Sequence, residues 1–330
     1  MTSPDKVKTW KLRSKLLASL HKFFDDRGFT HLDTPLLVGM PGYEVHLNFF
    51  QTDWFNLQHK AMPRFLRSSP EIHLKKALSS GLDKVYEVGK CFRNVGELGP
   101  LHHPEFTMVE WYQTDIDYMD FMQQTEDFLR QTREEFLRHF PSPLILPQSF
   151  RKISVFEAFE DFAKVQLVDD DPTLRYKAQA LGHDYLLPGD DFETSYFKIL
   201  LNTIEPRLKE LGAIFLYDFP PSQAALAEVK NGKAKRFEAY INGVELCNAF
   251  SELTSSEENK RRFADFSTKR QQIGATPFSV DEGFIAALDK GLPASCGNAL
   301  GFDRWFALLL GDSDLQRAIS FPSVSFPNLK

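Results

Sequence analysis

The chain has 330 residues, of which 42% are hydrophobic and 25% are charged, and this composition is typical of a globular protein with one large domain or two smaller ones. The formal net charge of -6 gives no general electrostatic basis for nucleic-acid binding. No apolar run is long enough to span a membrane, residues 1–9 lack a signal-peptide core, and the three cysteines lack metal-ligand spacing, so we expect a cytoplasmic protein with reduced thiols.

The first 140 residues alternate between helical and strand patterns. In chain order these patterns predict a helix over 5–26 that ends at Gly28, a strand over 29–37 broken by Pro35, a helix over 71–80, strands over 85–88 and 107–112, and a helix over 119–139. The segment 96–104 contains two glycines and two prolines and is predicted to be a loop between the two strands.

The rest of the chain begins with a segment, about 140–210, that we interpret as a mostly helical insertion. The later predictions are a strand over 213–219, a hairpin of 236–241 and 244–250 around Asn242 and Gly243, helices over 258–273 and 280–290, and a last helix over 303–311. Hairpin strands with intervening helices indicate an α+β fold, an antiparallel sheet flanked by helices. We expect a single domain over 1–330.

Two arginines are candidates for phosphate binding. Arg93 follows a predicted strand and opens a loop, where its fork of donors could hold a phosphate and a carboxylate oxygen together. The alternative is a surface arginine paired with Glu87 or Glu97. Arg304 begins the last helix after a glycine-rich turn, where the helix N-terminus also favours anions. We expect Asp303 to orient Arg304.

Acidic residues recur across the predicted hairpin. Glu238, Glu245 and Glu252 are seven residues apart, and the hairpin could fold Glu238 beside Glu245. Two adjacent carboxylates are natural ligands for a magnesium ion that also binds phosphate oxygens. The alternative is a solvated acidic hairpin.

Other candidate residues are polar or aromatic. Asn248 and Phe250 follow the hairpin, although Phe250 could belong to the core. His102 and Phe106 lie on either side of the loop end, where the imidazole could reach outer phosphates and the ring could stack on a purine. The alternatives are an exposed histidine and a strand residue in the core.

The segments 91–94, 103–112 and 297–304 resemble motifs 2 and 3 of class II aminoacyl-tRNA synthetases, and residues 10–325 resemble the catalytic domain of the lysyl branch. The resemblance implies use of ATP with Mg²⁺ to activate an amino acid. It implies these roles: α- and γ-phosphate binding by Arg93 and Arg304, adenine stacking by Phe106, contact of His102 with the terminal phosphate, Mg²⁺ binding by Glu238 and Glu245, ε-ammonium binding by Glu110, Tyr112 and Glu252, and amine binding near the carboxylate by Ser69 and Glu71. A lysine ammonium removed from water needs such carboxylate partners.

Three features are more similar to the elongation factor P–(R)-β-lysine ligase family than to tRNA synthetases. The first motif begins by about Thr34, which leaves no room for an N-terminal anticodon-binding domain, so we do not expect tRNA binding. Residues 219–227 resemble a segment of those ligases. Ala299 replaces the usual glycine, and its methyl would fill space that the α-amine of lysine needs; such a shape change is worth about 1–3 kcal/mol. Lysine remains the alternative substrate.

The chain departs from the family pattern in the loop after Arg93. Glu97 stands four residues after Arg93 and the loop is one residue longer, so which acid contacts adenine stays open. Pro100 and His103 replace an arginine and an asparagine of the family.

Two other functions stay open. One is a truncated lysyl-tRNA synthetase or another lysyl-adenylate-forming enzyme, and the other is a synthetase-like binding module without catalysis. Residues 11–37 resemble the element through which class II catalytic domains pair, so we expect a homodimer.

Overall fold

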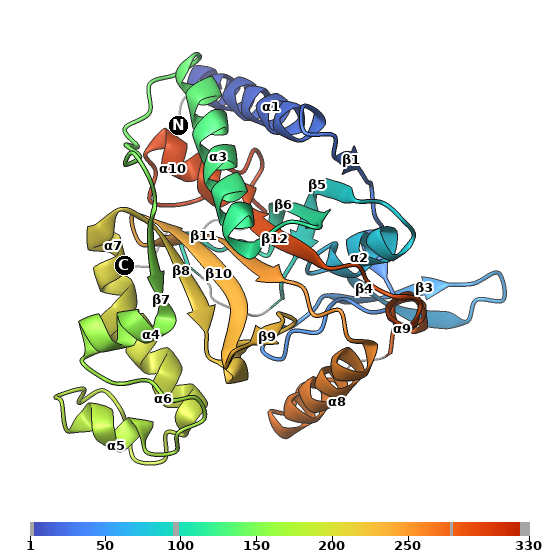
Figure 1. Cartoon of the computed structure of the whole chain (residues 1–330). Coiled ribbons are helices and arrows are strands. Elements are labelled where there is room, and N and C mark those ends of the chain that lie inside the picture. Colours follow the sequence, from blue (N-terminus) through green and yellow to red (C-terminus); the bar gives the residue numbers. More distant parts are fainter. Residues whose placement is uncertain (1–2, 95–98, 278–279, 324–330) are drawn as a thin grey trace. The chain divides into compact units, whose positions relative to one another are not determined.

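Figure 1 shows the computed structural model, which describes residues 3–94, 99–277 and 280–323. Contacts divide the chain into two units, Met1–Ile145 with Leu253–Lys330, and Leu146–Glu252. Each unit has its own strands and helices, and each is described separately below. The expected single domain remains a prediction.

The first unit is built on two long strands that the sequence analysis predicted in part. β5 (Lys84–Phe92) and β6 (Glu105–Thr114) pair antiparallel, and β12 (Ser295–Gly301) pairs antiparallel with the other edge of β6. β1 (Thr30–His31) adds a short parallel strand to β5. The prediction of a glycine-rich turn before Arg304 is wrong, because the residues concerned, 297–301, belong to strand β12.

Helices cover one face of this sheet. α1 (Ser3–Asp25) and α3 (Tyr118–Leu137) lie side by side (Figure 1). Their buried aromatic side chains pack with those of the strands: Phe24 stacks on Tyr86 with ring centroids 4.3 Å apart and lies 5.5 Å from Trp111. Helix α10 (Phe302–Leu310) follows β12 directly. The Trp111 face of β6 is therefore core, and alternation along the strand leaves Glu110 and Tyr112 on the opposite face.

Three further helices belong to the first unit. α2 (Glu71–Ser79) lies between residues 37–66 and β5 in the chain, while α8 (Ser256–Gln272) and α9 (Glu282–Lys290) precede β12. The Asp281 carboxylate caps α9 by accepting from Phe284 N over 2.8 Å and also accepts from Lys76 Nζ of α2. Helices α2 and α9 are thus joined by both packing and charge.

Residues 37–66 form a small sheet that the sequence analysis did not predict. β3 (Gln51–Phe55) and β4 (Ala61–Leu66) make a hairpin, and β2 (Leu37–Val38) pairs with β4. Pro35 separates β1 from β2, as expected, and the two strands join different sheets. β4 runs directly into the segment that carries Ser69 and Glu71.

The strands of the second unit lie side by side in one sheet, in the order β11-β10-β8-β7. β10 (Lys233–Ile241) lies between β8 (Ala213–Phe219) and β11 (Val244–Ser251), antiparallel to both, and β7 (Arg151–Ser154) is parallel to β8. The short β9 (Val229–Lys230) pairs with β10. Asn242 and Gly243 have φ angles of 53° and 79°, as a type I′ turn requires.

Helices in the second unit pack on one face of this sheet (Figure 1). They are α4 (Val155–Ala158), α5 (Leu174–Gln179), α6 (Phe192–Ile199) and α7 (Glu205–Leu211), with π-helical turns at Phe159–Ala163 and Leu200–Ile204. Their core includes Phe159 and Tyr196, whose rings stack 5.2 Å apart. The segment predicted as mostly helical thus also contributes strand β7.

Candidate nucleotide and amino-acid site

Arg93 lies immediately after β5 and is exposed. Its backbone N–H donates to Pro104 O over 3.0 Å, and its guanidinium carbon lies 5.3 Å from the ring centroid of Phe106 on β6. The alternative partner Glu87 is excluded, because Glu87 is buried and accepts from Arg67 over 2.5 Å. Glu97 lies outside the described residues. The structure therefore places a cation beside an aromatic ring at the strand end, a combination that suits a phosphate next to a purine.

Arg304 is the third residue of α10, whose N-cap is Gly301. Its guanidinium donates to Leu101 O over 3.2 Å and to His102 Nε2 over 2.7 Å. Since a guanidinium can only donate, His102 accepts at Nε2 and carries its proton on Nδ1 when neutral. Arg304 and His102 are thus brought together as the phosphate roles would require.

Asp303 does not orient Arg304, contrary to expectation. It accepts from Arg13 Nη2 over 2.7 Å and from the backbone N–H of Thr107 over 2.7 Å. The carboxylate is buried and ties α10 to α1 and to β6.

Glu110 is the centre of a second cluster, on the β6 face that α1 and α3 leave uncovered. It is 1% exposed, and its two oxygens accept from the hydroxyls of Ser69 and Tyr112, each over 2.7 Å. Burial, with the charge of Glu71, raises the pKa of Glu110 to about 8 against the pull of these two hydrogen bonds. Ala299 of β12 lies directly opposite Glu110.

Glu71 adjoins this cluster at the first turn of α2. Its backbone N–H donates to Ser69 Oγ over 2.9 Å, and its carboxylate accepts from Lys75 over 2.5 Å. The predicted residues Ser69, Glu71, Glu110 and Tyr112 therefore meet in one cluster. Lys75, which the sequence analysis missed, is buried and supplies a positive charge there; helical i,i+4 spacing from Glu71 was the signal that could have identified it.

The acidic residues of the second unit are arranged differently from the expectation. Glu238 faces Asn248 across the β10–β11 pair, and Glu245 faces Tyr240, so the two glutamates are not directly opposite. A bulge between Ala239 and Tyr240 shifts the register and places Glu245 on the same strand face as Glu238. They are diagonal neighbours on one face.

Arg236 is a residue of this face that the sequence analysis did not select. It donates to Glu238 Oε1 over 2.5 Å and to Asn248 Oδ1 over 3.1 Å, and it lies 6.0 Å from the ring centroid of Phe250. The other oxygen of Glu238 accepts from Tyr240 over 2.8 Å. The predicted residues Glu238, Asn248 and Phe250 are therefore connected through one arginine.

A magnesium site is compatible with this face but is not complete in the protein. Within the described ranges, no group of three or more histidine, cysteine or acidic side chains could hold a metal ion by itself. Glu238 and Glu245 share a face, so a cation there would draw its remaining ligands from phosphate oxygens and water. Glu252 is buried at the end of this unit, in an isolated bridge with Ala227.

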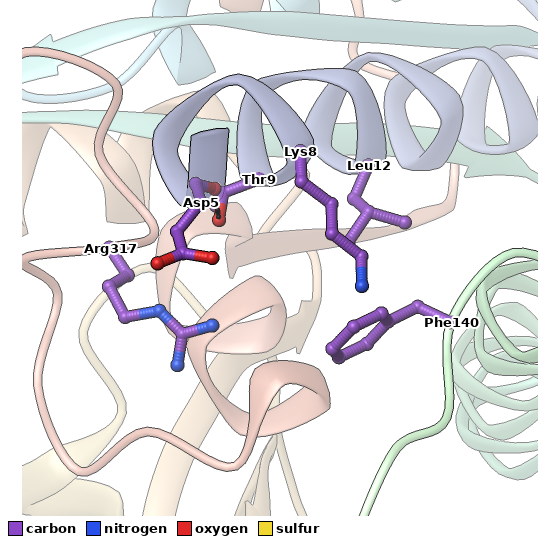
Figure 2. A pocket seen from close by; sticks show the side chains of 6 residues that line it. All are labelled: Asp5, Lys8, Thr9, Leu12, Phe140 and Arg317. Carbon is purple, nitrogen blue, oxygen red and sulfur yellow. Dashed lines mark hydrogen bonds between the residues drawn. The ribbon is translucent and has the colours of Figure 1, made fainter. Parts of the chain in front are cut away.

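A separate hollow lies on the first unit beside α1. Figure 2 shows Lys8 of α1 above the Phe140 ring. The Lys8 ammonium nitrogen lies 4.5 Å from the ring centroid. The hollow has a volume of about 240 Å³ and is lined by Asp5, Lys8, Thr9, Leu12, Phe140 and Arg317. None of the predicted site residues lines it.

Two other expectations concern general properties. The three cysteines are buried and free, as predicted for reduced thiols. Helices long and apolar enough to cross a bilayer are absent from the part of the chain that the structure describes.

The chain is similar to known proteins over nearly its full length. The profile of tRNA synthetases class II (D, K and N) matches residues 1–325. The elongation factor P–(R)-β-lysine ligase of Hamiltonella defensa is 33% identical over 94% of this chain and 93% of its own length. The ligases of the same name from Vibrio atlanticus and Vibrio cholerae are each 34% identical, over 96% and 94% of this chain and the same shares of their own lengths.

Proposed function

We propose a function from the family to which the chain belongs, the class II tRNA synthetases (D, K and N) and, among them, the elongation factor P–(R)-β-lysine ligases. The chain activates (R)-β-lysine with ATP and transfers the β-lysyl group to a lysine side chain of elongation factor P. The similarity extends over nearly the full length of both partners. The observation in the structure that supports this substrate best is the Glu110 cluster, a buried acidic site suited to a diamino acid.

The nucleotide would bind at the ends of β5, β6 and β12. Arg93 would contact the α-phosphate, and Phe106 beside it would stack on adenine. Arg304 would hold the γ-phosphate with His102. Exposure of Arg93 supports this role, because an exposed guanidinium is available to a phosphate.

The amino acid would bind at the Glu110 cluster. Glu110 and Tyr112 would receive the ε-ammonium, and Ser69 and Glu71 would receive the amine nearer to the carboxyl group. The Ala299 methyl next to Glu110 would favour an amine one carbon further from the carboxylate. In the second unit, Asn248, Phe250 and Glu252 are the proposed contributors to amino-acid binding.

The reaction has two steps and needs no protein nucleophile. In the first, a carboxylate oxygen of β-lysine attacks the α-phosphorus of ATP; the bond to the β-phosphate oxygen breaks and pyrophosphate leaves. In the second, the neutral ε-amine of the acceptor lysine attacks the carbonyl carbon of the adenylate, AMP leaves, and the amine loses its proton to solvent. Arg93 and Arg304 would position and neutralise the phosphates in both directions of the first step.

Mg²⁺ is proposed as the accompanying metal, with Glu238 and Glu245 as the residues that would hold it. When bound, it would neutralise phosphate charge. Arg236 would keep the Glu238 carboxylate in position, since it already donates to one of its oxygens. We further expect the enzyme to act in the cytoplasm and as a homodimer.

The first test is amino-acid-dependent exchange of pyrophosphate into ATP. We expect exchange with (R)-β-lysine to exceed that with α-lysine by about 10–200-fold, because the shape difference at Ala299 is of this size.

The variant Arg93→Ala should lower the rate of pyrophosphate exchange by about 10²–10³-fold, as expected for loss of a donor to developing charge. Arg138→Ala is the matched control, since Arg138 is an exposed arginine on the end of α3, paired with Glu135.

The outcomes separate the candidate functions. Exchange with α-lysine only would indicate a lysyl-adenylate enzyme with another acceptor, and no exchange with either amino acid would contradict catalysis by this chain. The acceptor is tested in a second assay with elongation factor P, in which mass spectrometry should detect one added β-lysyl group on a lysine. Activation without this transfer would contradict only the proposed acceptor.

A further inference from the structure

Glu44 lies in a segment, residues 43–49, that the sequence analysis left without a role. This segment is fastened to α8: Arg270 Nη1 donates to the carbonyl oxygens of Glu44, Val45 and Leu47 over 3.2, 2.9 and 2.7 Å. Tyr43 stacks on Phe263 of the same helix with ring centroids 3.7 Å apart. The backbone of Glu44 is therefore fixed on both sides.

The Glu44 side chain folds back toward Ser68. The Ser68 hydroxyl lies 3.3 Å from Glu44 Oε2 and 3.0 Å from Pro41 O, so one hydroxyl proton is shared between the two acceptors. A Cβ on Gly42 would overlap both the Glu44 carboxylate and the Ser68 hydroxyl. Glycine at position 42 is thus what allows the carboxylate to occupy this place.

Ser68 and Ser69 connect this carboxylate to the amino-acid site. Ser69 donates to Glu110 and accepts from the backbone of Glu71, and the preceding Ser68 contacts Glu44. Burial raises the pKa of Glu44, the Arg93 charge lowers it, and the Glu71 charge raises it again. Glu44 therefore interacts electrostatically with Arg93, the residue proposed to bind phosphate, and with Glu71, the residue proposed to bind an amine.

Among the described residues, the acids Glu44 and Glu110 of this cluster have no direct ion pair. Glu71 is paired with Lys75, but in the described ranges neither Glu44 nor Glu110 has a lysine, arginine or histidine nitrogen within 4.0 Å of its carboxylate. A carboxylate taken from water without a cation is unfavourable by several kcal/mol. Two acids without a direct cationic partner match the two ammonium groups of a diamino acid.

We infer that Glu44 is a specificity-determining residue of the amino-acid site, and that its carboxylate binds, with Glu71, the ammonium group nearer to the carboxyl end of the diamino acid. Glu110 then serves the distal ammonium. The inference rests on the proposed function, because it assigns one residue to the substrate of that reaction. It predicts that Glu44 discriminates between substrates with and without the nearer amine.

The test measures binding rather than turnover. Calorimetry with the full chain would compare (R)-β-lysine with 6-aminohexanoic acid, which has the same chain and distal amine but lacks the nearer one. The relevant quantity is the dissociation constant of 6-aminohexanoic acid divided by that of (R)-β-lysine. The Glu44→Gln variant should reduce this ratio by at least about tenfold, a size typical of a lost charged partner.

Two further variants make the result decisive. Glu44→Asp keeps the charge on a shorter side chain and should reduce the ratio less, and it replaces Glu44→Gln should that variant fail to fold. Asp53→Asn, in the exposed strand β3, is the control and should leave the ratio unchanged. An equal loss of affinity for both ligands, or no loss, would overturn the role of Glu44. Failure of the unaltered protein to bind (R)-β-lysine would instead contradict the proposed function.

Discussion

Glu110 shows at the scale of one residue how the fold prepares a site for a cation. Burial on a strand face, together with the charge of Glu71, raises the pKa of its carboxyl group to about 8, although two hydroxyl donors oppose this shift. Near neutral pH, Glu110 without a bound ammonium therefore favours the protonated acid. A bound ammonium would favour the carboxylate, so binding of the amino acid is coupled to loss of a proton.

A prediction for Glu110→Gln follows from this pKa. The ordinary pKa of the glutamate is 4.5, so between pH 4.5 and 8 the native state binds a proton that the unfolded state has lost. The free energy of unfolding contributed by Glu110 therefore falls as pH rises through this window and is constant above it. Glutamine mimics the protonated acid and has no such dependence. Thermal melting of the ligand-free protein should show the variant gaining stability over the unaltered protein as pH rises from 5 to 8.5.

The control for that experiment is Glu134→Gln, which changes an exposed glutamate of α3. Its stability difference from the unaltered protein should not vary with pH in the same way. A constant difference for Glu110→Gln across the range would show that the carboxyl group titrates as an ordinary glutamate, and would contradict its proposed environment.

At the scale of elements, Arg270 fixes the segment 43–49 to helix α8. It is 3% exposed, and besides the three carbonyl groups it donates to Thr276 O over 2.7 Å, four residues beyond the end of the helix. Replacement by alanine leaves these acceptors without their charged donor, a loss of about 1.5–3 kcal/mol for a hydrogen bond to a charged group. We expect Arg270→Ala to increase hydrogen exchange of the amides in 43–49 and to weaken (R)-β-lysine binding.

The matched control is Arg261→Ala, an exposed arginine of the same helix that pairs with Glu258 and Asp265. Faster exchange confined to 43–49 in Arg270→Ala alone would support a positioning role. Equal exchange in the two variants would mean that the Tyr43 stacking holds the segment instead, and it would contradict the positioning role of Arg270.

The elements also show which features a single sequence can predict. The interruption at Pro35 and the Asn242–Gly243 turn were predictable, because each depends on local backbone chemistry. The bulge beside Tyr240 was not, and it decides that Glu245 shares a face with Glu238. Strand β12 was mistaken for a turn, since its glycines carry no strand pattern and its conformation comes from pairing with β6.

The candidate site was predicted to a similar extent and for similar reasons. Residues within recognisable motifs, such as Arg93 and Glu110, were selected from the sequence. Glu44 and Arg236 were not selected, because they are proposed from tertiary contacts with Ser68 and Glu238 that no local pattern encodes. The roles of all these residues stay predictions until the variants are measured.

At the scale of the whole molecule, the remaining expectation is a homodimer through residues 11–37. Leu36 and Leu37 in this region are 41% and 43% exposed, which is compatible with apolar contact to a second copy. Light scattering after size-exclusion chromatography should give about twice the chain mass of 37.9 kDa. The variant Leu37→Glu should shift the mass toward that of one chain, because a charge buried without a partner in an interface weakens association.

Leu57→Glu is the control, since Leu57 is 96% exposed in the β3–β4 turn, outside the predicted interface. Dissociation by Leu57→Glu alone would move the interface to that hairpin, and a single-chain mass for the unaltered protein would contradict the dimer.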